Sequence, residues 1–218
     1  MNDEVSILEK QLEEISIQLK EFEKQRLINT DSYCLYKEKR IIQRKLSIAK
    51  NQETAILIDY PYPWDTGAPL PHVISNGYKT FLIYYVGEHN SKWNPSNKNI
   101  TDLNTGHDDI TALVKFINCY NYKFGGINDE VIHGHPLYKH GLEAYEAHII
   151  INSKWLKEQE SINSVHSNYS HTLWENYKHY IFTFHDEIFE CIASDYKVDI
   201  FKGRICSVFS EATNKLFE

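Results

Sequence analysis

Two histidines one residue apart, His133 and His135, form the first pattern in this sequence that could do chemistry. They lie in the stretch V-I-H-G-H-P-L, and the pattern has chemical meaning if this stretch is extended. Side chains alternate along a strand, so both imidazoles would project from the same face. Such an H-x-H pair offers two nitrogens to one divalent metal ion. Three nearby side chains could supply a third ligand: His140, Glu143 and His148.

A second candidate, His185, stands directly before Asp186 in the stretch F-H-D-E-I-F-E-C. An adjacent carboxylate can orient an imidazole as a general base. We therefore predict His185, Asp186 and Glu190 as catalytic residues. His185 is also the predicted third metal ligand beside His133 and His135. A structural role for His185 fits the sequence equally well.

Carboxylates precede the H-x-H pair at Asp129 and Glu130, so we predict a ligand-binding set of these two residues with His133 and His135. The pattern lacks the specificity of a known metal motif, because neither H-x-H-x-D-H nor H-E-x-x-H occurs. All 11 histidines lie after residue 50, so some pairing is expected by chance. Ordinary core and surface histidines are the alternative.

An acidic loop over residues 102–109 superficially suggests calcium. An EF-hand needs glycine at its sixth position and glutamate at its twelfth. Gly106 is the fifth residue from Asp102, and Leu113 takes the twelfth position. We therefore predict a solvated turn.

The charge is unevenly distributed along the chain. Residues 1–50 carry 10 basic and 9 acidic residues, whereas residues 51–218 carry 13 basic and 21 acidic residues, a net charge of −8. An acidic body without a basic cluster disfavours nucleic acid. The longest apolar run, Phe81–Val86, is too short to cross a membrane. The four cysteines form no C-x-x-C pair, and no signal peptide is evident, so we expect a cytoplasmic protein.

The strongest periodic signal lies in the first fifty residues. One stripe has the 3-4 spacing of a coiled-coil seam: Val5, Leu8, Leu12, Ile15, Leu19 and Phe22. A second stripe follows a polar cluster at residues 29–32 that offers helix capping: Leu35, Ile42, Leu46 and Ala49. The spacing predicts two helices. The seam could be covered by its own hairpin partner, by the body, or by another chain.

The rest of the chain reads as strands and turns. Residues 61–71 hold four prolines, which exclude a helix or an inner strand. Aromatic and branched residues predict strands at 78–86 and 110–122 and a hairpin at 179–193 that turns at Asp186 and Glu187. We expect an α+β protein with a helical hairpin or coiled coil (residues 1–50) followed by a mainly antiparallel, β-rich domain (residues 53–218).

The stretch from Gly125 to Ala193 contains N-D-E-V-I-H-G-H-P-L, N-S-K-W and H-Y-I-F-T-F-H-D-E-I-F-E-C-I-A. It resembles an uncharacterised bacterial protein family with an H-G-H-P-L … F-H-D-x-x-F-E-C pattern. That family has no known activity. The resemblance implies a self-contained module to which the helical segment is joined.

Two hypotheses about function follow from these patterns. In the first, the chain is an interaction or small-ligand-binding protein, assembled as a homo-oligomer or with a partner protein through residues 1–50. In the second, it is a metal-dependent hydrolase that uses the histidine and carboxylate cluster of the body. The first is favoured, because the seam is the one strong signal and each catalytic candidate has a structural alternative.

Overall fold

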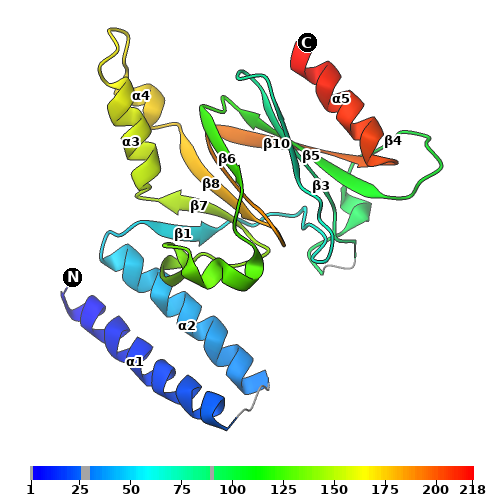
Figure 1. The fold of residues 1–218 in the computed structure, drawn as a ribbon. Helices are drawn as coiled ribbons and strands as arrows, with labels where there is room; N and C mark the ends of the chain where they lie inside the picture. Colours follow the sequence, from blue (N-terminus) through cyan, green and yellow to red (C-terminus); the bar gives the residue numbers. More distant parts are fainter. Residues whose placement is uncertain (1, 26–29, 89–90) are drawn as a thin grey trace.

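A computed structural model describes residues 2–25, 30–88 and 91–218 of this chain. As the sequence predicts, two long helices, α1 (Asn2–Lys24) and α2 (Thr30–Ala49), precede a β-rich body. The helices form a hairpin at one end of the molecule, and α2 lies between α1 and the body (Figure 1). Residue 29 of the predicted capping cluster lies outside the described residues.

The body contains two five-stranded sheets. Sheet A is antiparallel and consists, in spatial order, of β1 (Thr54–Leu57), β7 (Ala147–Ile151), β8 (Lys178–Thr183), β9 (Ile188–Ala193) and β6 (Asn121–Gly125). Sheet B consists of β2 (His72–Ser75), β3 (Thr80–Tyr85), β5 (Ile110–Ile117), β10 (Asp195–Lys202) and β4 (Ile100–Asp102). Only the β10–β4 pair, among the described strands, is parallel. The mainly antiparallel prediction is confirmed.

The two sheets face each other across an aromatic core. Alternate residues of β3 and β5 in sheet B meet alternate residues of β8 and β9 in sheet A. Phe116 lies at the centre and contacts the rings of Phe182 and Phe189. The proline-containing segment closes one side of this core with Tyr60 and Trp64, both buried.

Each outer face is covered by a separate element. Helix α5 (Ile205–Phe217) packs on sheet B through Val208, Ala212 and Leu216. Two 3-10 helices, η2 (Asp129–Gly134) and η3 (Tyr138–His140), cover sheet A through Ile132 and Leu137. The remaining short elements are η1 (Pro95–Asn97), α3 (Lys154–Asn163) and α4 (His171–Trp174).

Three expectations for the body need correction. The H-x-H stretch is not extended, because the Asn128 side chain caps a helical turn by accepting from the Val131 amide. The β8–β9 turn comes one residue early, at His185 and Asp186, and closes with a hydrogen bond from the Phe184 amide to the Glu187 carbonyl. The strand predicted over residues 110–122 is interrupted at residues 118–120, so that its first part, β5, lies in sheet B and its last residues begin β6 of sheet A.

The seam of α1 is covered within the same chain. Leu8, Ile15 and Leu19 pack against Ile42 of α2, with partly buried residues of both helices around them. Of the three covers considered for the seam, the hairpin partner is the one found. The seam itself is therefore not a surface on which another chain can dock.

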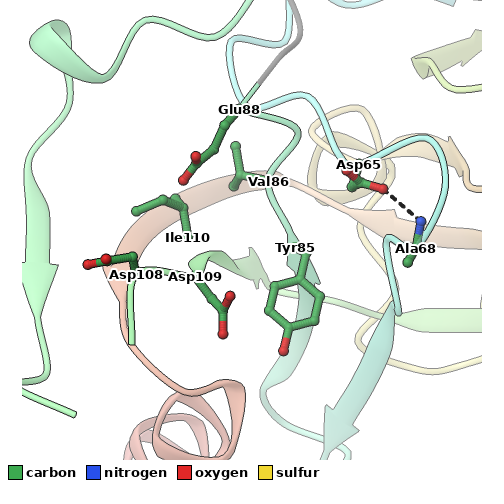
Figure 2. Close-up of a pocket in the computed structure, with 8 residues that line it drawn as sticks. All are labelled: Asp65, Ala68, Tyr85, Val86, Glu88, Asp108, Asp109 and Ile110. Carbon is green, nitrogen blue, oxygen red and sulfur yellow. Dashed lines mark hydrogen bonds between the residues drawn. The ribbon is translucent and has the colours of Figure 1, made fainter. Parts of the chain in front are cut away.

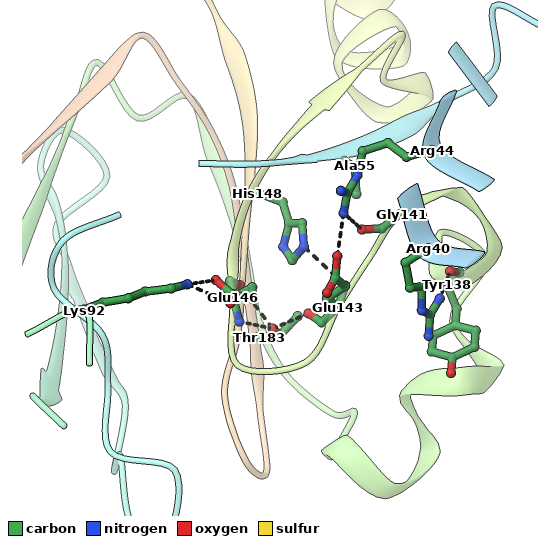
Figure 3. A network of polar contacts seen from close by, with 10 residues as sticks. All are labelled: Arg40, Arg44, Ala55, Lys92, Tyr138, Gly141, Glu143, Glu146, His148 and Thr183. Atoms are coloured by element: carbon green, nitrogen blue, oxygen red, sulfur yellow. Dashed lines mark hydrogen bonds and ion pairs between the residues drawn. The ribbon is translucent and has the colours of Figure 1, made fainter. Parts of the chain in front are cut away.

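Helix α2 is attached to the body by arginines on its other side. Arg40 Nη1 donates to the Tyr138 carbonyl at 2.5 Å, and its guanidinium lies 3.6 Å from the centre of the Tyr138 ring. Arg44 donates to the carbonyl of Ala55 at 3.0 Å and of Gly141 at 2.8 Å, and forms an ion pair with Glu143 at 2.6 Å. These contacts join α2 to the edge strand β1 and to η3 (Figure 3).

The segment 141–146 continues this network into sheet A. The Glu143 amide donates to Nε2 of His148, a fully buried residue, at 3.2 Å. Thr183 Oγ1 donates to the Glu143 carbonyl at 2.8 Å and accepts from the Glu146 amide at 3.1 Å, while Lys92 pairs with the Glu146 carboxylate at 2.7 Å (Figure 3). Burial lowers the pKa of His148 from 6.5 to about 3.

None of the described helices combines the length and apolar character that a membrane span requires.

We predict that Gly141→Ala destabilises the fold through the docking site of α2. Gly141 has φ +96°, and a Cβ atom there would lie 2.5 Å from the Ala55 carbonyl oxygen and 2.8 Å from Arg44 Nε. The matched control is Gly126→Ala, at φ +88° with nothing within 4 Å of the added atom. Both variants carry the backbone cost, but Gly141→Ala adds overpacking of about 1–3 kcal/mol. Equal urea midpoints for the two variants would contradict this.

We also predict that His148 makes the fold acid-sensitive. Its pKa is 6.5 when unperturbed and about 3 in the fold. As pH falls below 6.5, His148 binds a proton in the unfolded chain but stays neutral in the folded chain. The free energy of unfolding therefore decreases as pH falls toward 3. One proton corresponds to about 1.4 kcal/mol per pH unit.

His148→Gln keeps an acceptor for the Glu143 amide but does not titrate. Urea unfolding between pH 6 and pH 4 should give a shallower loss of stability for this variant than for the natural chain. The control is His107→Gln, which removes an exposed imidazole. If both variants keep the natural slope, the acid sensitivity comes from other groups.

Candidate functional site

The structure divides the predicted site residues into two groups. The first, here called the turn cluster, lies at the β8–β9 turn and consists of Asp129, Tyr145, His185 and Asp186. The second, the histidine cluster, lies on the outer face of β8 and β9 and comprises His135, Ser153, His179 and Glu190 with Lys123 and Trp155.

In the turn cluster, two pairs of side chains lie against each other. Nδ1 of His185 is 2.9 Å from Asp186 Oδ1, and the Tyr145 hydroxyl donates to Asp129 Oδ2. The rings of Tyr145 and His185 are 6.4 Å apart, and the Asp129 amide donates to the His185 carbonyl at 2.9 Å. A carboxylate only accepts, so Nδ1 of His185 carries the proton and Nε2 is the acceptor of the neutral ring.

Two features of the turn cluster remain unexplained by folding alone. The second carboxylate oxygen of Asp129, Oδ1, is buried and makes no hydrogen bond of normal geometry among the described residues, although the backbone amides of Asp129 and Glu130 lie near the carboxylate and lower its pKa. Tyr145 has φ +59°, a left-handed conformation that is unfavourable for a residue with a side chain. Strain and an unpaired buried acceptor both occur more often at functional sites than elsewhere.

The electrostatics of the turn cluster favour negative charge on its carboxylates. The hydrogen bond from Tyr145 lowers the pKa of Asp129. Burial, and then that same hydrogen bond, raises the pKa of Tyr145 to about 12. The hydrogen bond to Asp186 raises the pKa of His185, with the charges of Asp129 and Glu130 acting in the same direction. The cluster therefore attracts protons and other cations.

The histidine cluster has a different character, because its central ring is enclosed. His179 is 3% exposed and contacts Ser153 Oγ through Nδ1 at 2.8 Å and Glu190 Oε2 through Nε2 at 3.1 Å. Glu190 can only accept, so Nε2 of His179 carries a proton and Nδ1 of the neutral ring accepts from Ser153 Oγ, which also caps α3 by accepting from the Leu156 amide. The Nε2 proton then goes to Glu190, and both ring nitrogens are occupied.

The surroundings of His179 complete this enclosure. The Trp155 ring lies edge-on, 5.1 Å from the His179 ring, and Lys123 lies 3.8 Å from the centre of Trp155 and 3.5 Å from Glu190 Oε2. Burial raises the pKa of Glu190, but the His179 hydrogen bond and the Lys123 charge outweigh it and lower the pKa overall. Ser153 is also 3% exposed. A serine, histidine and glutamate in contact resemble a catalytic triad, but here the arrangement joins α3 to sheet A.

The predicted site residues are only partly brought together. Asp129, His185 and Asp186 meet in the turn cluster, with Glu130 close enough to affect His185. Glu190 and His135 belong to the histidine cluster, where burial lowers the pKa of His135. His133 is exposed, and its Nδ1 contacts only the Glu130 carbonyl within the described part of the chain. Among the described residues, no three His, Cys, Asp or Glu side chains are placed to hold a metal ion.

Five members of these clusters were missed by the sequence reasoning: Tyr145, Ser153, His179, Lys123 and Trp155. Tyr145 stands in an irregular loop, where spacing carries no information about direction. Ser153 and His179 are 26 residues apart and meet only because α3 begins beside β8. For Ser153 a usable signal exists, since a serine before K-W-L-K is a helix cap.

An acidic hollow of about 440 Å³ lies elsewhere, at the end of sheet B. Asp65, Glu88, Asp108 and Asp109 are among its lining residues (Figure 2). Asp65 is already used, because its Oδ1 accepts from the amides of Gly67 and Ala68, and Asp108 pairs with Lys202 at 2.7 Å. The loop expected to be a solvated turn thus supplies two of the four carboxylates.

Comparison with known proteins adds no identity to this geometry. No protein-family model, no curated protein and no solved structure matches this chain. The resemblance to an uncharacterised bacterial family therefore stays a prediction from sequence, and the function must be argued from the side chains themselves.

Proposed function

We propose that this chain is a small-ligand-binding protein whose body recognises its ligand at the turn cluster. The observation that carries the proposal is the buried Oδ1 atom of Asp129, which lacks a partner among the described residues. A buried acceptor left unpaired costs roughly 1–3 kcal/mol. A ligand that donates a hydrogen bond there removes that cost on binding, provided that the Asp129 side chain turns Oδ1 outward, since this atom has almost no exposed surface in the free fold.

The chemistry of the turn cluster selects the class of ligand. Asp129 Oδ1 is an acceptor, and so is Nε2 of neutral His185. Asp186 and Glu130 add negative charge around them. Two acceptors in an acidic setting suit a cationic group with N–H donors, such as an ammonium or a guanidinium group.

Metal-dependent hydrolysis remains a prediction of the sequence alone. Its three ligands have different surroundings: exposed solvent for His133, the histidine cluster for His135 and the turn cluster for His185. No contact of these three residues favours the hydrolase over the binding protein. The contacts of the turn cluster therefore support the binding protein as the proposed function.

We predict that methylguanidinium binds to the turn cluster of the full chain and that acetate does not. Titration of the labelled protein should shift the His185 ring resonances saturably in NMR spectra. Binding should strengthen as pH rises through the raised pKa of His185, because the protonated ring repels a cation and no longer accepts.

Asp129→Asn tests the carboxylate at nearly constant shape and should weaken methylguanidinium binding at least tenfold. Asp195→Asn, which removes an exposed carboxylate outside the cluster, should leave it unchanged. An equal response to acetate, or undiminished binding by Asp129→Asn, would reject the turn cluster as the ligand site.

A further inference from the structure

The helical hairpin has two long edges, and one of them is closed by polar contacts. Lys50 Nζ pairs with Glu9 at 2.6 Å, and the Tyr36 hydroxyl donates to Glu23 at 3.0 Å. Each of these four residues directly follows a residue of the two predicted apolar stripes in the sequence. One residue corresponds to a rotation of about 100°, so all four lie on the same side of the seam.

Residues that directly precede a stripe residue lie on the opposite, open edge of the hairpin. On α2 these include an apolar row with a spacing of seven residues: Cys34, Ile41 and Ile48. Ile41 is 49% exposed and Ile48 is 46% exposed. On α1 the same edge carries Ile7, which is 57% exposed. Large apolar side chains gathered on one edge indicate a docking surface.

Neither α1 nor the body covers this edge. The body contacts α2 through Arg40 and Arg44, which lie on the side of α2 away from α1 (Figures 1 and 3). The open edge is therefore accessible to another helical pair that approaches from the side. A second hairpin laid along it completes a four-helix bundle.

The distribution of charge on the two helices indicates which helical pair binds to the open edge. Helix α1 carries seven acidic and three basic residues, whereas α2 carries two acidic and five basic residues. The contacts Glu9–Lys50 and Glu23–Tyr36 fix the level of one helix against the other. Counting five residues inward from the first pair places Glu14 level with Lys45. Counting two residues inward from the second pair places Glu21 level with Glu38, next to Lys37.

We propose that the open edge binds a second copy of this chain, related by a two-fold axis parallel to the helices. This axis places α2 of each copy against α1 of the other at the same level. Lys45 then meets Glu14 of the second copy, and Lys37 meets its Glu21. A two-fold axis across the helices would instead place acidic α1 on acidic α1 and basic α2 on basic α2.

The inference goes beyond ligand binding at the turn cluster and does not depend on it. It concerns the open edge of the hairpin, which stays exposed although the seam is buried within the chain. The apolar row supplies the area removed from water, and the charged residues beside it set the orientation.

Two charge-reversed forms of the full chain test the arrangement, Glu14→Lys with Glu21→Lys and Lys37→Glu with Lys45→Glu. The natural chain should sediment as a dimer, and each form alone should dissociate with at least a tenfold higher Kd. Mixing the two forms should restore a heterodimer, because each α1 then meets an oppositely charged α2. The control is Ile162→Lys, which introduces a charge at an exposed isoleucine of α3, outside the hairpin. This variant should stay dimeric.

Cross-linking tests the direction of the axis. The two Cys34 residues lie at the same level, so a short bismaleimide should join the copies, and Cys34→Ser should abolish the product. Cys206→Ser, at another exposed cysteine, should not. The proposal would be overturned by any of three results. These are a natural chain that stays monomeric, a dimer that survives both charge reversals, and a form that dimerises more tightly alone than in the mixture. None of these outcomes alters the methylguanidinium titration.

Discussion

The contacts of one side chain, Arg44, hold the separate parts of this molecule in register. Its guanidinium reaches the carbonyl of the edge strand β1, the carbonyl of Gly141 and the carboxylate of Glu143. Hydrogen bonds from a charged donor are each stronger than neutral ones, at about 1.5–3 kcal/mol. The Arg44 side chain is 15% exposed and that of Glu143 is 31% exposed, so water competes only in part for these partners. Without such a fixed point, a hairpin that buries its seam on itself would have little reason to adopt one orientation on the body.

The body gains its rigidity from a different source, the aromatic core between the sheets. Phe116, Phe182 and Phe189 contact one another, and two buried tyrosines of the same core, Tyr60 and Tyr84, share a hydrogen bond. The Tyr84 hydroxyl donates to the Tyr62 carbonyl at 2.8 Å, so it accepts from the Tyr60 hydroxyl at 2.7 Å. Aromatic rings fill such a core at low entropic cost, but only if each hydroxyl finds a partner. The segment with four prolines supplies these partners, which explains its place over the core.

The sequence predicts the elements of this fold better than the meetings between them. Periodicity identifies the two helices and the strand pairs, because 3.6-residue and two-residue repeats are local properties. It misplaces the β8–β9 turn by one residue, since Asp186 and Glu187 differ little from His185 and Asp186 as turn formers. The strand propensity of Val131 and Ile132 favours an extended conformation for residues 131–137. In the structure the cap supplied by Asn128 outweighs that propensity, and a helical turn forms. Glu190 and His185, five residues apart, belong to different clusters because His185 lies in the β8–β9 turn, whereas Glu190 lies opposite Ile181 within the strands.

The segment 141–146 is where the hairpin and the turn cluster meet. Arg44 holds its beginning through Gly141 and Glu143, and Thr183 holds its end through the Glu146 amide. Tyr145 lies between these two attachments in a left-handed conformation that costs about 1–2 kcal/mol for a residue with a Cβ atom. Such a conformation persists only where the surroundings enforce it. The direction of the Tyr145 hydroxyl toward Asp129 is therefore fixed by attachments on both sides of the segment, from Arg44 of α2 and from Thr183 of sheet A.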